Sequence, residues 1–109
     1  GVILLKCFLH ISKEEQKRRL QRRLERSDKH WKFSRADLAE RKRWRAYQQA
    51  YDAVLRRCST RAAPWHVIPA DHKWYRDLAV AGLLHRTMES LDLQFPAPEP
   101  GLEDLSVPD

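Results

Sequence analysis

Apolar residues fill positions 2–11 almost without a break, and most of them are β-branched or large. A strand that is apolar on both faces is typical of the interior of a parallel sheet. Ser12 follows this run and Glu15 stands three positions later, a capping-box pattern that ends a strand and begins a helix. The pattern therefore predicts a strand covered on both faces over residues 2–11 and a helix over about residues 13–26.

A second helix is predicted over about residues 35–57, where apolar side chains recur at three- and four-residue steps. The recurring side chains are Leu38, Trp44, Tyr47, Tyr51, Val54 and Leu55. Ser34, with Asp37 three positions on, forms a second capping signature at the start of this helix. We interpret the aromatic stripe as a packing surface rather than as a platform for stacked bases.

Residues 59–64 break the second helix, and the short apolar run at residues 65–68 predicts a second strand that Pro69 ends. Asp71 is expected to cap a third helix with a wide apolar face, which suits packing against a sheet. That face consists of one stripe, with Trp74, Leu78, Ala81, His85 and Met88, and a neighbouring stripe, with Tyr75, Ala79, Gly82 and Leu83. Residues 95–109 are rich in proline and then acidic, which predicts an extended, mobile tail.

This order of elements predicts an α/β fold class that is mostly helical, with two parallel strands, a helical hairpin between them and a C-terminal helix. At 109 residues the chain has room for one domain. Two strands leave both sheet edges open, which complete folds avoid, and the chain starts at Gly1 directly in strand-like sequence. We therefore expect a portion of a longer protein whose further strands precede Gly1.

Charge is unevenly distributed along the chain. Residues 1–58 hold 17 Lys and Arg against 7 Asp and Glu, a balance of +10, whereas residues 59–109 carry −4, for a net charge of +6. The excess of positive charge in residues 1–58 attracts polyanions such as nucleic acid, phosphate chains or anionic lipid. The longest apolar run, residues 2–5, is far too short to cross a membrane.

Five arginines share one broad sector of the first predicted helix, with a single acidic residue, Glu25, among them. They are Arg18, Arg19, Arg22, Arg23 and Arg26. We expect them to repel one another rather than to form ion pairs along the helix. A solvated surface would also explain such a stripe, but its composition favours binding to a polyanion.

The cysteines and histidines form no recognisable metal or disulfide pattern. Cys7 and Cys58 lie far apart with no CxxC, and the five histidines form neither HxxxH nor HExxH. The sequence therefore predicts no metal site in this chain. Two thiols of this kind are typical of a cytoplasmic protein.

Three segments stand at the junctions between predicted elements. They are FLHISKEEQ at Phe8–Gln16, HWKFS at His30–Ser34, and APW at Ala63–Trp65 followed by VIPADHKW at Val67–Trp74. In order and spacing, residues 1–94 resemble the C-terminal part of the family 2 polyphosphate kinases. The resemblance implies a P-loop kinase fold that moves a phosphoryl group between inorganic polyphosphate and a nucleoside mono- or diphosphate, with Mg²⁺ as cofactor.

The resemblance also implies an organisation of the chain. Residues 1–94 would be the C-terminal part of a single P-loop kinase-like domain, with residues 13–58 as a lid over the active site, and residues 95–109 would be the tail. The strand at residues 65–69 and its helix would return to the parallel sheet. Polyphosphate and a nucleotide are the implied partners, with no membrane partner, and a homo-oligomer of the full-length parent is left open.

Four cations are the candidate site residues by this resemblance: Arg18, Arg22, Lys32 and Lys73 would line a polyphosphate channel. Lys73 could equally be a solvated residue. Asp37 could be a functional carboxylate, although its capping position favours a structural role.

The catalytic residues cannot be named from this sequence. A phosphate-binding loop of the form Gly-x-x-x-x-Gly-Lys needs closely spaced glycines. The glycines present are Gly1, Gly82 and Gly101. The acidic residue and the arginine that the family supplies before its lid are missing as well. We therefore expect the ligands of Mg²⁺ to lie outside this chain, and we expect the chain alone to be inactive.

Two other functions stay open at this point. The chain could be a small basic helical module that binds nucleic acid, because aromatic residues interleave with Lys and Arg as they do in single-strand binders. These aromatic residues are Trp31, Phe33, Trp44 and Tyr47. A helical hairpin that binds a protein partner is the weaker alternative. The predicted strands on both sides of the hairpin favour the kinase interpretation.

Overall fold

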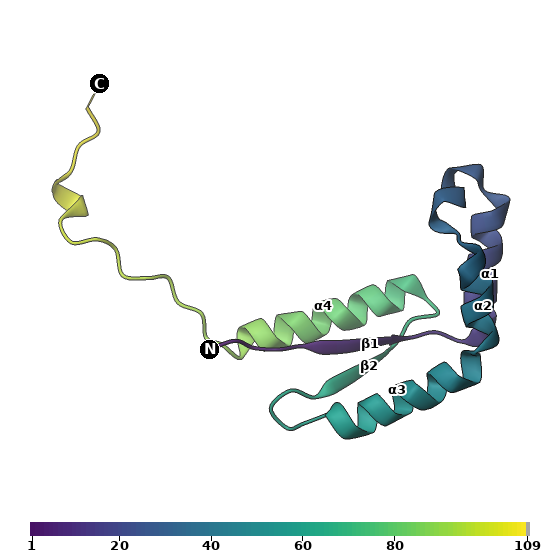
Figure 1. Ribbon diagram of the computed structural model, residues 1–109. Helices are drawn as coiled ribbons and strands as arrows, with labels where there is room; N and C mark the ends of the chain where they lie inside the picture. The colour runs from purple at the N-terminus through teal and green to yellow at the C-terminus, as the bar shows by residue number, and fades with distance from the viewer. Residues whose placement is uncertain (109) are drawn as a thin grey trace.

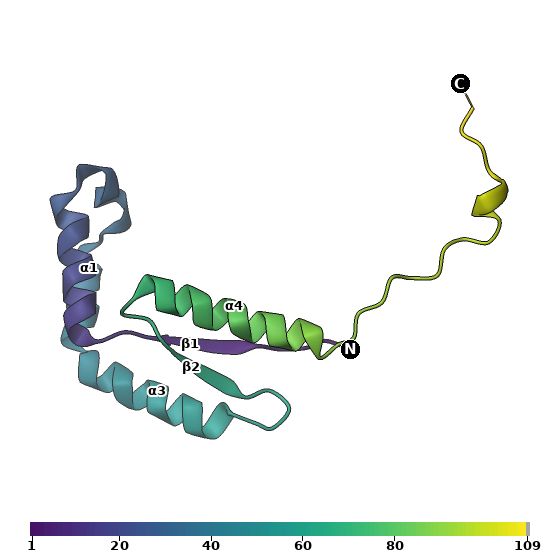
Figure 2. The same cartoon turned by 180° about the vertical axis from the view of Figure 1, so that it is seen from behind.

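The computed structural model describes residues 1–108 (Figure 1). Along the chain the elements are β1 (Lys6–His10), α1 (Lys13–Glu25), η1 (Ser27–Lys32), α2 (Arg35–Lys42), α3 (Trp44–Cys58), β2 (Trp65–Pro69), α4 (Lys73–Glu89) and η2 (Leu102–Asp104), where η marks a 3₁₀ helix. Figures 1 and 2 show the two strands between α3 and α4, with α1 and α2 standing side by side at one end of the strands.

The two strands pair in parallel, from Lys6 opposite Trp65 to His10 opposite Pro69. The predicted parallel pair is thereby confirmed. The prediction of a strand over residues 2–11 that is covered on both faces is wrong, because β1 spans only Lys6–His10 and none of its residues is fully buried. In the described part of the chain β1 has one neighbouring strand, β2, and Leu9 stays 48% exposed.

The start of α1 combines one predicted contact with one that the sequence did not predict. Ser12 caps the helix as expected, because its Oγ accepts a hydrogen bond from the backbone N–H of Glu15 at 3.1 Å. The Ser12 N–H, however, donates to Asp71 Oδ1 at 2.7 Å rather than to Glu15. Asp71 was expected to cap the third helix, and this is wrong: α4 begins at Lys73 after His72, with no side-chain cap. The Asp71 carboxylate is instead engaged by α1.

The predicted helix over residues 35–57 is divided at Arg43, whose φ of −88° and ψ of 15° lie outside the helical region. Contacts in two directions explain the break. In α2, Arg41 Nη1 donates to the carbonyl of Lys13 at 2.8 Å, which holds α2 against α1. In α3, the ring of Tyr51 packs against Phe8 of β1, with 5.0 Å between ring centroids. A straight helix could not satisfy both contacts, so the chain bends between them.

The capping box at the start of α2 is confirmed. Ser34 Oγ accepts from the N–H of Ala36 at 3.2 Å, and Asp37 Oδ2 accepts from the N–H of Ser34 at 3.1 Å. Asp37 therefore has the structural role that its position indicates.

The core is small: the buried apolar residues are Leu20, Ile68 and Ala70. The prediction that α4 presses a wide apolar face against the sheet is met only in part, because no residue of α4 is buried. Tyr75, Ala79, Gly82 and Leu83 line a groove with residues of β2, and Leu78 of the other stripe lines it too. Tyr75 is 42%, Leu78 64% and Trp74 67% exposed.

The segment after α4 leads away from the body of the molecule in an extended path (Figures 1 and 2). The short turn of η2 follows Gly101, whose φ of 80° is in the left-handed region that glycine adopts readily. The boundary at residue 94 and the mobility of the tail stay predictions, and Asp109 lies outside the described residues. Within residues 1–108, no helix is long and apolar enough to span a membrane.

Candidate anion-binding site

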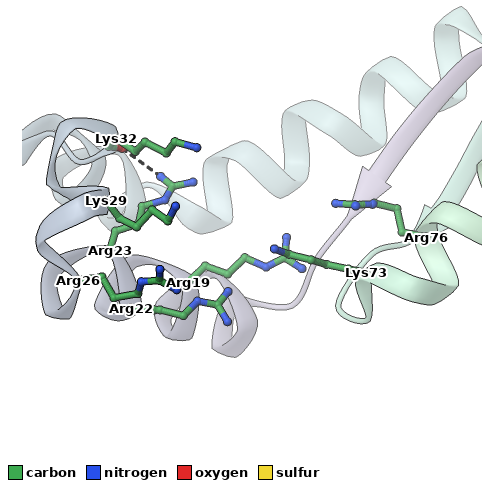
Figure 3. Close-up of a pocket in the computed structure, with 8 residues that line it drawn as sticks. All are labelled: Arg19, Arg22, Arg23, Arg26, Lys29, Lys32, Lys73 and Arg76. Carbon is green, nitrogen blue, oxygen red and sulfur yellow. Dashed lines mark hydrogen bonds between the residues drawn. The ribbon is translucent and has the colours of Figure 1, made fainter.

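A pocket of about 320 Å³ lies where α1 and η1 face the start of α4 (Figure 3). Every residue that lines it is a lysine or an arginine: Arg19, Arg22, Arg23, Arg26, Lys29, Lys32, Lys73 and Arg76. Side chains of one sign gathered around a hollow concentrate a positive potential within it. The pocket is therefore suited to an anion with several charges.

Local structure brings these cations to one place. Helical spacing puts Arg19, Arg22 and Arg23 of α1 on one face, because residues three and four apart are neighbours on a helix, and Arg26 follows as the residue that ends α1. After Arg26, η1 turns the chain so that Lys29 and Lys32 come to the same hollow. The opposite wall comes from α4, where Lys73 and Arg76 lie three residues apart in the first turn.

Three of the four candidate residues meet in this pocket, and Arg18 does not. Arg22, Lys32 and Lys73 all line it. The side chain of Arg18 is 64% exposed and lines a separate depression with Ser12 and Asp71. A role in binding polyphosphate stays a prediction for all four residues.

Lys29 and Arg76 line the pocket but were not among the predicted site residues. Arg76 follows Lys73 by one helical turn, a spacing that could have pointed to it. No sequence pattern indicates that Lys29 lines the pocket, because its position depends on the path of η1.

Half of the eight lining cations have a carboxylate partner. The ion pairs are Arg19–Glu15 at 2.6 Å, Arg26–Asp28 at 3.0 Å, Lys29–Asp28 at 3.1 Å and Arg76–Asp77 at 2.7 Å. In the described part of the chain, the other four, Arg22, Arg23, Lys32 and Lys73, make no ion pair. Positive charge is thus in excess in the pocket, and these four cations are free to pair with a bound anion.

The expectation that the arginine stripe forms no ion pairs along the helix is wrong for two of its members. Glu15 stands three positions before Arg18 and four before Arg19, and it pairs with both at 2.6 Å. Glu15 is 8% exposed, which makes it a buried charge. Hydrogen bonds from Arg18 and Arg19 lower the pKa of Glu15 to about 2. The carboxylate is therefore ionised throughout the neutral range.

We expect the stability of the chain to depend on Glu15 in acid. A carboxyl group whose pKa is lower in the folded state stabilises the fold above its unfolded pKa, and this contribution is lost as the pH falls through the folded pKa. For Glu15 the loss falls between about pH 4.5 and about pH 2. Urea unfolding of the wild type and of Glu15→Gln, measured across this range, should give two midpoints that converge as the pH falls. A constant difference between the two would contradict this assignment.

Lys32 is held in place by two contacts. Its Nζ lies 4.7 Å from the ring centroid of Trp31, a cation–π arrangement, and its carbonyl accepts from Arg23 Nη1 at 3.3 Å (Figure 3). Trp31 itself is 78% exposed. The WK pair of the HWKFS segment therefore sits at the edge of the pocket with its aromatic ring turned to solvent.

The aromatic stripe of α3 takes part in packing, as interpreted from the sequence. Tyr51 contacts Phe8, and Tyr47 lies beside Tyr51 with 5.9 Å between ring centroids. The Tyr47 hydroxyl donates a hydrogen bond to Glu40, and this carboxylate raises the pKa of Tyr47. Tyr47 and Tyr51 each keep 39% of their surface exposed.

Comparisons with known proteins agree with the resemblance seen in the sequence. The family model described as Polyphosphate kinase 2 (PPK2) matches residues 1–96. The AMP/ADP-polyphosphate phosphotransferase of Meiothermus ruber is 49% identical over 107 residues, which cover 98% of this chain and 40% of the relative. The ADP-polyphosphate phosphotransferase of Rhodopseudomonas palustris is 42% identical over 100 residues, which cover 92% of this chain and 35% of the relative.

The crystal structure of polyphosphate kinase 2 from Arthrobacter aurescens TC1 superposes with a TM-score of 0.91 at 45% identity, over 95% of this chain and 37% of that chain. This match confirms the predicted α/β fold class, a portion of a P-loop kinase-like fold. The chain spans about two fifths of the length of these relatives. With a family model that matches most of its length and relatives this similar, the chain belongs to the polyphosphate kinase 2 family.

Proposed function

We propose that this chain is part of an enzyme that transfers phosphoryl groups between inorganic polyphosphate and a nucleoside mono- or diphosphate, and that the cationic pocket holds the polyphosphate. The names of the two relatives support the reaction class. The observation that carries the substrate assignment is the lining of the pocket, which consists of eight cations and nothing else.

Such a lining fits polyphosphate better than a nucleotide. A polyphosphate chain carries negative charge on every unit and has no base or sugar to recognise. A nucleotide pocket usually adds apolar walls and a few directed polar groups to fix the base. Phosphoryl transfer depends mainly on positioning and on neutralising negative charge, so a row of cations beyond the reacting phosphate serves both needs.

In this proposal α1, η1, α2 and α3 form the lid, which covers residues 13–58, while β2 and α4 continue the kinase sheet. The pocket lies where α1 and η1 of the lid face the start of α4 (Figure 3). Arg22, Lys32 and Lys73 bind phosphate groups inside the pocket. Arg18 contacts the chain where it extends beyond the pocket, since its guanidinium is exposed although it is paired with Glu15.

Mg²⁺ is the cofactor that the family resemblance implies. Among residues 1–108, no three His, Cys, Asp or Glu side chains are grouped so that they could hold a metal ion. The described residues therefore offer no binding site for Mg²⁺. We propose that the ligands of the ion lie outside this chain. A homo-oligomer of the parent and a cytoplasmic location stay predictions.

Nucleic-acid binding is the second candidate, because the exposed ring of Trp31 beside Lys32 could stack on a base. Competition separates the two functions. We expect linear polyphosphate to displace a fluorescent single-stranded oligonucleotide from the chain at far lower phosphate concentration than the oligonucleotide needs to displace polyphosphate. Fluorescence anisotropy, with both ligands counted per phosphate, measures this. Equal or reversed potency would contradict the polyphosphate assignment and favour the nucleic-acid module.

A further inference from the structure

A group of polar contacts joins the start of α1 to the loop between β2 and α4. Ser12 N–H donates to Asp71 Oδ1 at 2.7 Å. Arg19 Nη2 donates to the carbonyls of Ala70, at 2.7 Å, and of Asp71, at 3.2 Å. We call these four residues, together with Glu15, the clasp. The clasp connects parts of the chain that are 51 to 59 residues apart.

Glu15 is the centre of the clasp. Its Oε1 accepts from Arg19 Nε at 2.6 Å, and its Oε2 accepts from Arg18 Nε at 2.6 Å. A buried carboxylate is costly unless charged partners replace the water that it has lost. Because Glu15 engages the Nε edge of the Arg19 guanidinium, the Nη2 group of the same planar fork is directed to the two carbonyls of the loop.

The clasp lies between the two walls of the cationic pocket. Arg22 and Arg23 follow Arg19 on α1, Arg26 comes directly after the helix, and Lys73 stands two residues after Asp71. Figure 3 shows the Arg19 side chain reaching from α1 toward the start of α4. Like charges on facing walls repel each other, so the walls separate unless another contact holds them. In the empty pocket the clasp adds such a contact to the backbone hydrogen bond from the Ala70 N–H to the His10 carbonyl, at 2.7 Å, where the paired strands end.

We propose that Glu15 is a positioning residue for polyphosphate binding: through Arg19 it holds α1 against the loop before α4, so that cations of both helices face the same anion. This inference rests on the proposed function of the pocket. Glu15 itself touches no phosphate, since an anion would repel it. Its effect on binding passes through Arg19 and the spacing of the two walls.

Glu14 offers a matched control for Glu15. It is the adjacent residue, it is exposed, and within residues 1–108 it makes no ion pair. Glu14→Gln and Glu15→Gln change the net charge equally, and charge alone predicts that both variants bind polyphosphate more tightly. A positioning role predicts that the two variants differ in their affinity for polyphosphate. Glu14→Gln should bind polyphosphate as tightly as the wild type or more tightly, and Glu15→Gln should bind it more weakly.

The size of the loss can be set by analogy. Removing a residue that only orients a metal ligand costs ~10–100-fold in affinity. For a flexible anion we expect the lower end, about tenfold for Glu15→Gln. Calorimetric titration of the 109-residue chain with linear polyphosphate of one fixed length measures it, with far-UV circular dichroism to establish that each variant is folded.

A second pair of variants keeps the net charge constant. Arg19→Lys retains the positive charge but lacks the planar fork that reaches Glu15 and two carbonyls at once. Arg45→Lys, at an exposed position of α3 outside the pocket, is its control. We expect weaker polyphosphate binding for Arg19→Lys and no change for Arg45→Lys. Because Arg19 also lines the pocket, its affinity alone does not separate positioning from direct contact. If Glu15→Gln fails to fold, the distance between the two helices in Arg19→Lys, measured as described below, decides the question: a broader distribution than in the wild type supports positioning, and an unchanged one overturns it.

The spacing of the walls can also be measured directly. Spin labels at Leu24→Cys in α1 and Leu84→Cys in α4, both half-exposed positions, report the distance between the helices once Cys7 and Cys58 are replaced by Ser. Glu15→Gln should broaden this distance distribution and Glu14→Gln should not, a difference that a purely local ion pair would not cause.

The outcomes separate the two proposals. If the wild type binds polyphosphate and the two glutamate variants bind equally, the positioning role is overturned and the pocket assignment stands. If the wild type does not bind polyphosphate, the proposed function fails, and the positioning role fails with it.

Discussion

Replacing Arg22, Lys32 and Lys73 together by Gln should weaken polyphosphate binding by roughly a hundredfold. A cation beside an anionic surface contributes about 1 kcal/mol, and each 1.4 kcal/mol is about tenfold in affinity. These three residues make no ion pair within the described chain, so no internal carboxylate offsets their loss. Gln and Arg are similar helix formers, which keeps helix propensity nearly constant. Calorimetric titration at fixed salt measures the change.

A control with the same change in net charge tests whether the pocket matters. Arg45, Arg57 and Arg61 are exposed and do not line the pocket. Their joint replacement by Gln should reduce affinity only slightly. By analogy with nucleic acids, the dependence of log Kd on log salt should become less steep by ~0.7–0.9 per lost phosphate contact in the first variant. Equal losses in both triple variants would show that total charge, rather than the pocket, binds polyphosphate.

The chain alone should transfer no phosphoryl group. Lid cations can stabilise a transition state only when other groups hold the reacting phosphate, the nucleotide and the attacking oxygen in line. The backbone of a Gly-x-x-x-x-Gly-Lys loop performs this task in P-loop enzymes, and the printed sequence has no such loop. A luciferase assay for ATP formed from ADP and polyphosphate, with Mg²⁺ present, should give a signal no higher than a protein-free blank.

The Meiothermus ruber relative is the positive control for this assay, since its name describes the reaction. It should give a signal under identical conditions. If the purified 109-residue chain forms ATP, and still does so after a further purification step, the proposal that the catalytic groups lie outside this chain is contradicted.

Features that depend on neighbours along the chain were predictable from the sequence. Ser12 and Ser34 cap their helices as the capping patterns indicate. The two strands pair in parallel, because a helical crossover between short apolar runs leaves few other arrangements. The pairing of Glu15 with Arg18 and Arg19 was also within reach, since its spacing follows from helix geometry.

Features that depend on distant contacts were not predictable. Asp71 has a suitable position in the sequence to cap α4, but its carboxylate accepts a hydrogen bond from the N–H of Ser12, 59 residues earlier. No proline or glycine near Arg43 predicts the break in the helix. The break arises because α2 and α3 pack against different partners. Likewise, Lys29 joins the pocket only because η1 turns the chain after Arg26.

The location of bound polyphosphate is the most direct test of the central claim that the cationic pocket is its binding site. Arginine side-chain Nε–Hε signals in ¹H–¹⁵N spectra, followed while linear polyphosphate is added to the ¹⁵N-labelled chain, report which guanidinium groups it contacts. We predict saturable shifts for Arg22, Arg23 and Arg26, which line the pocket, and none for Arg45, Arg57 and Arg61. Equal shifts in both groups, or shifts confined to the second, would contradict the account.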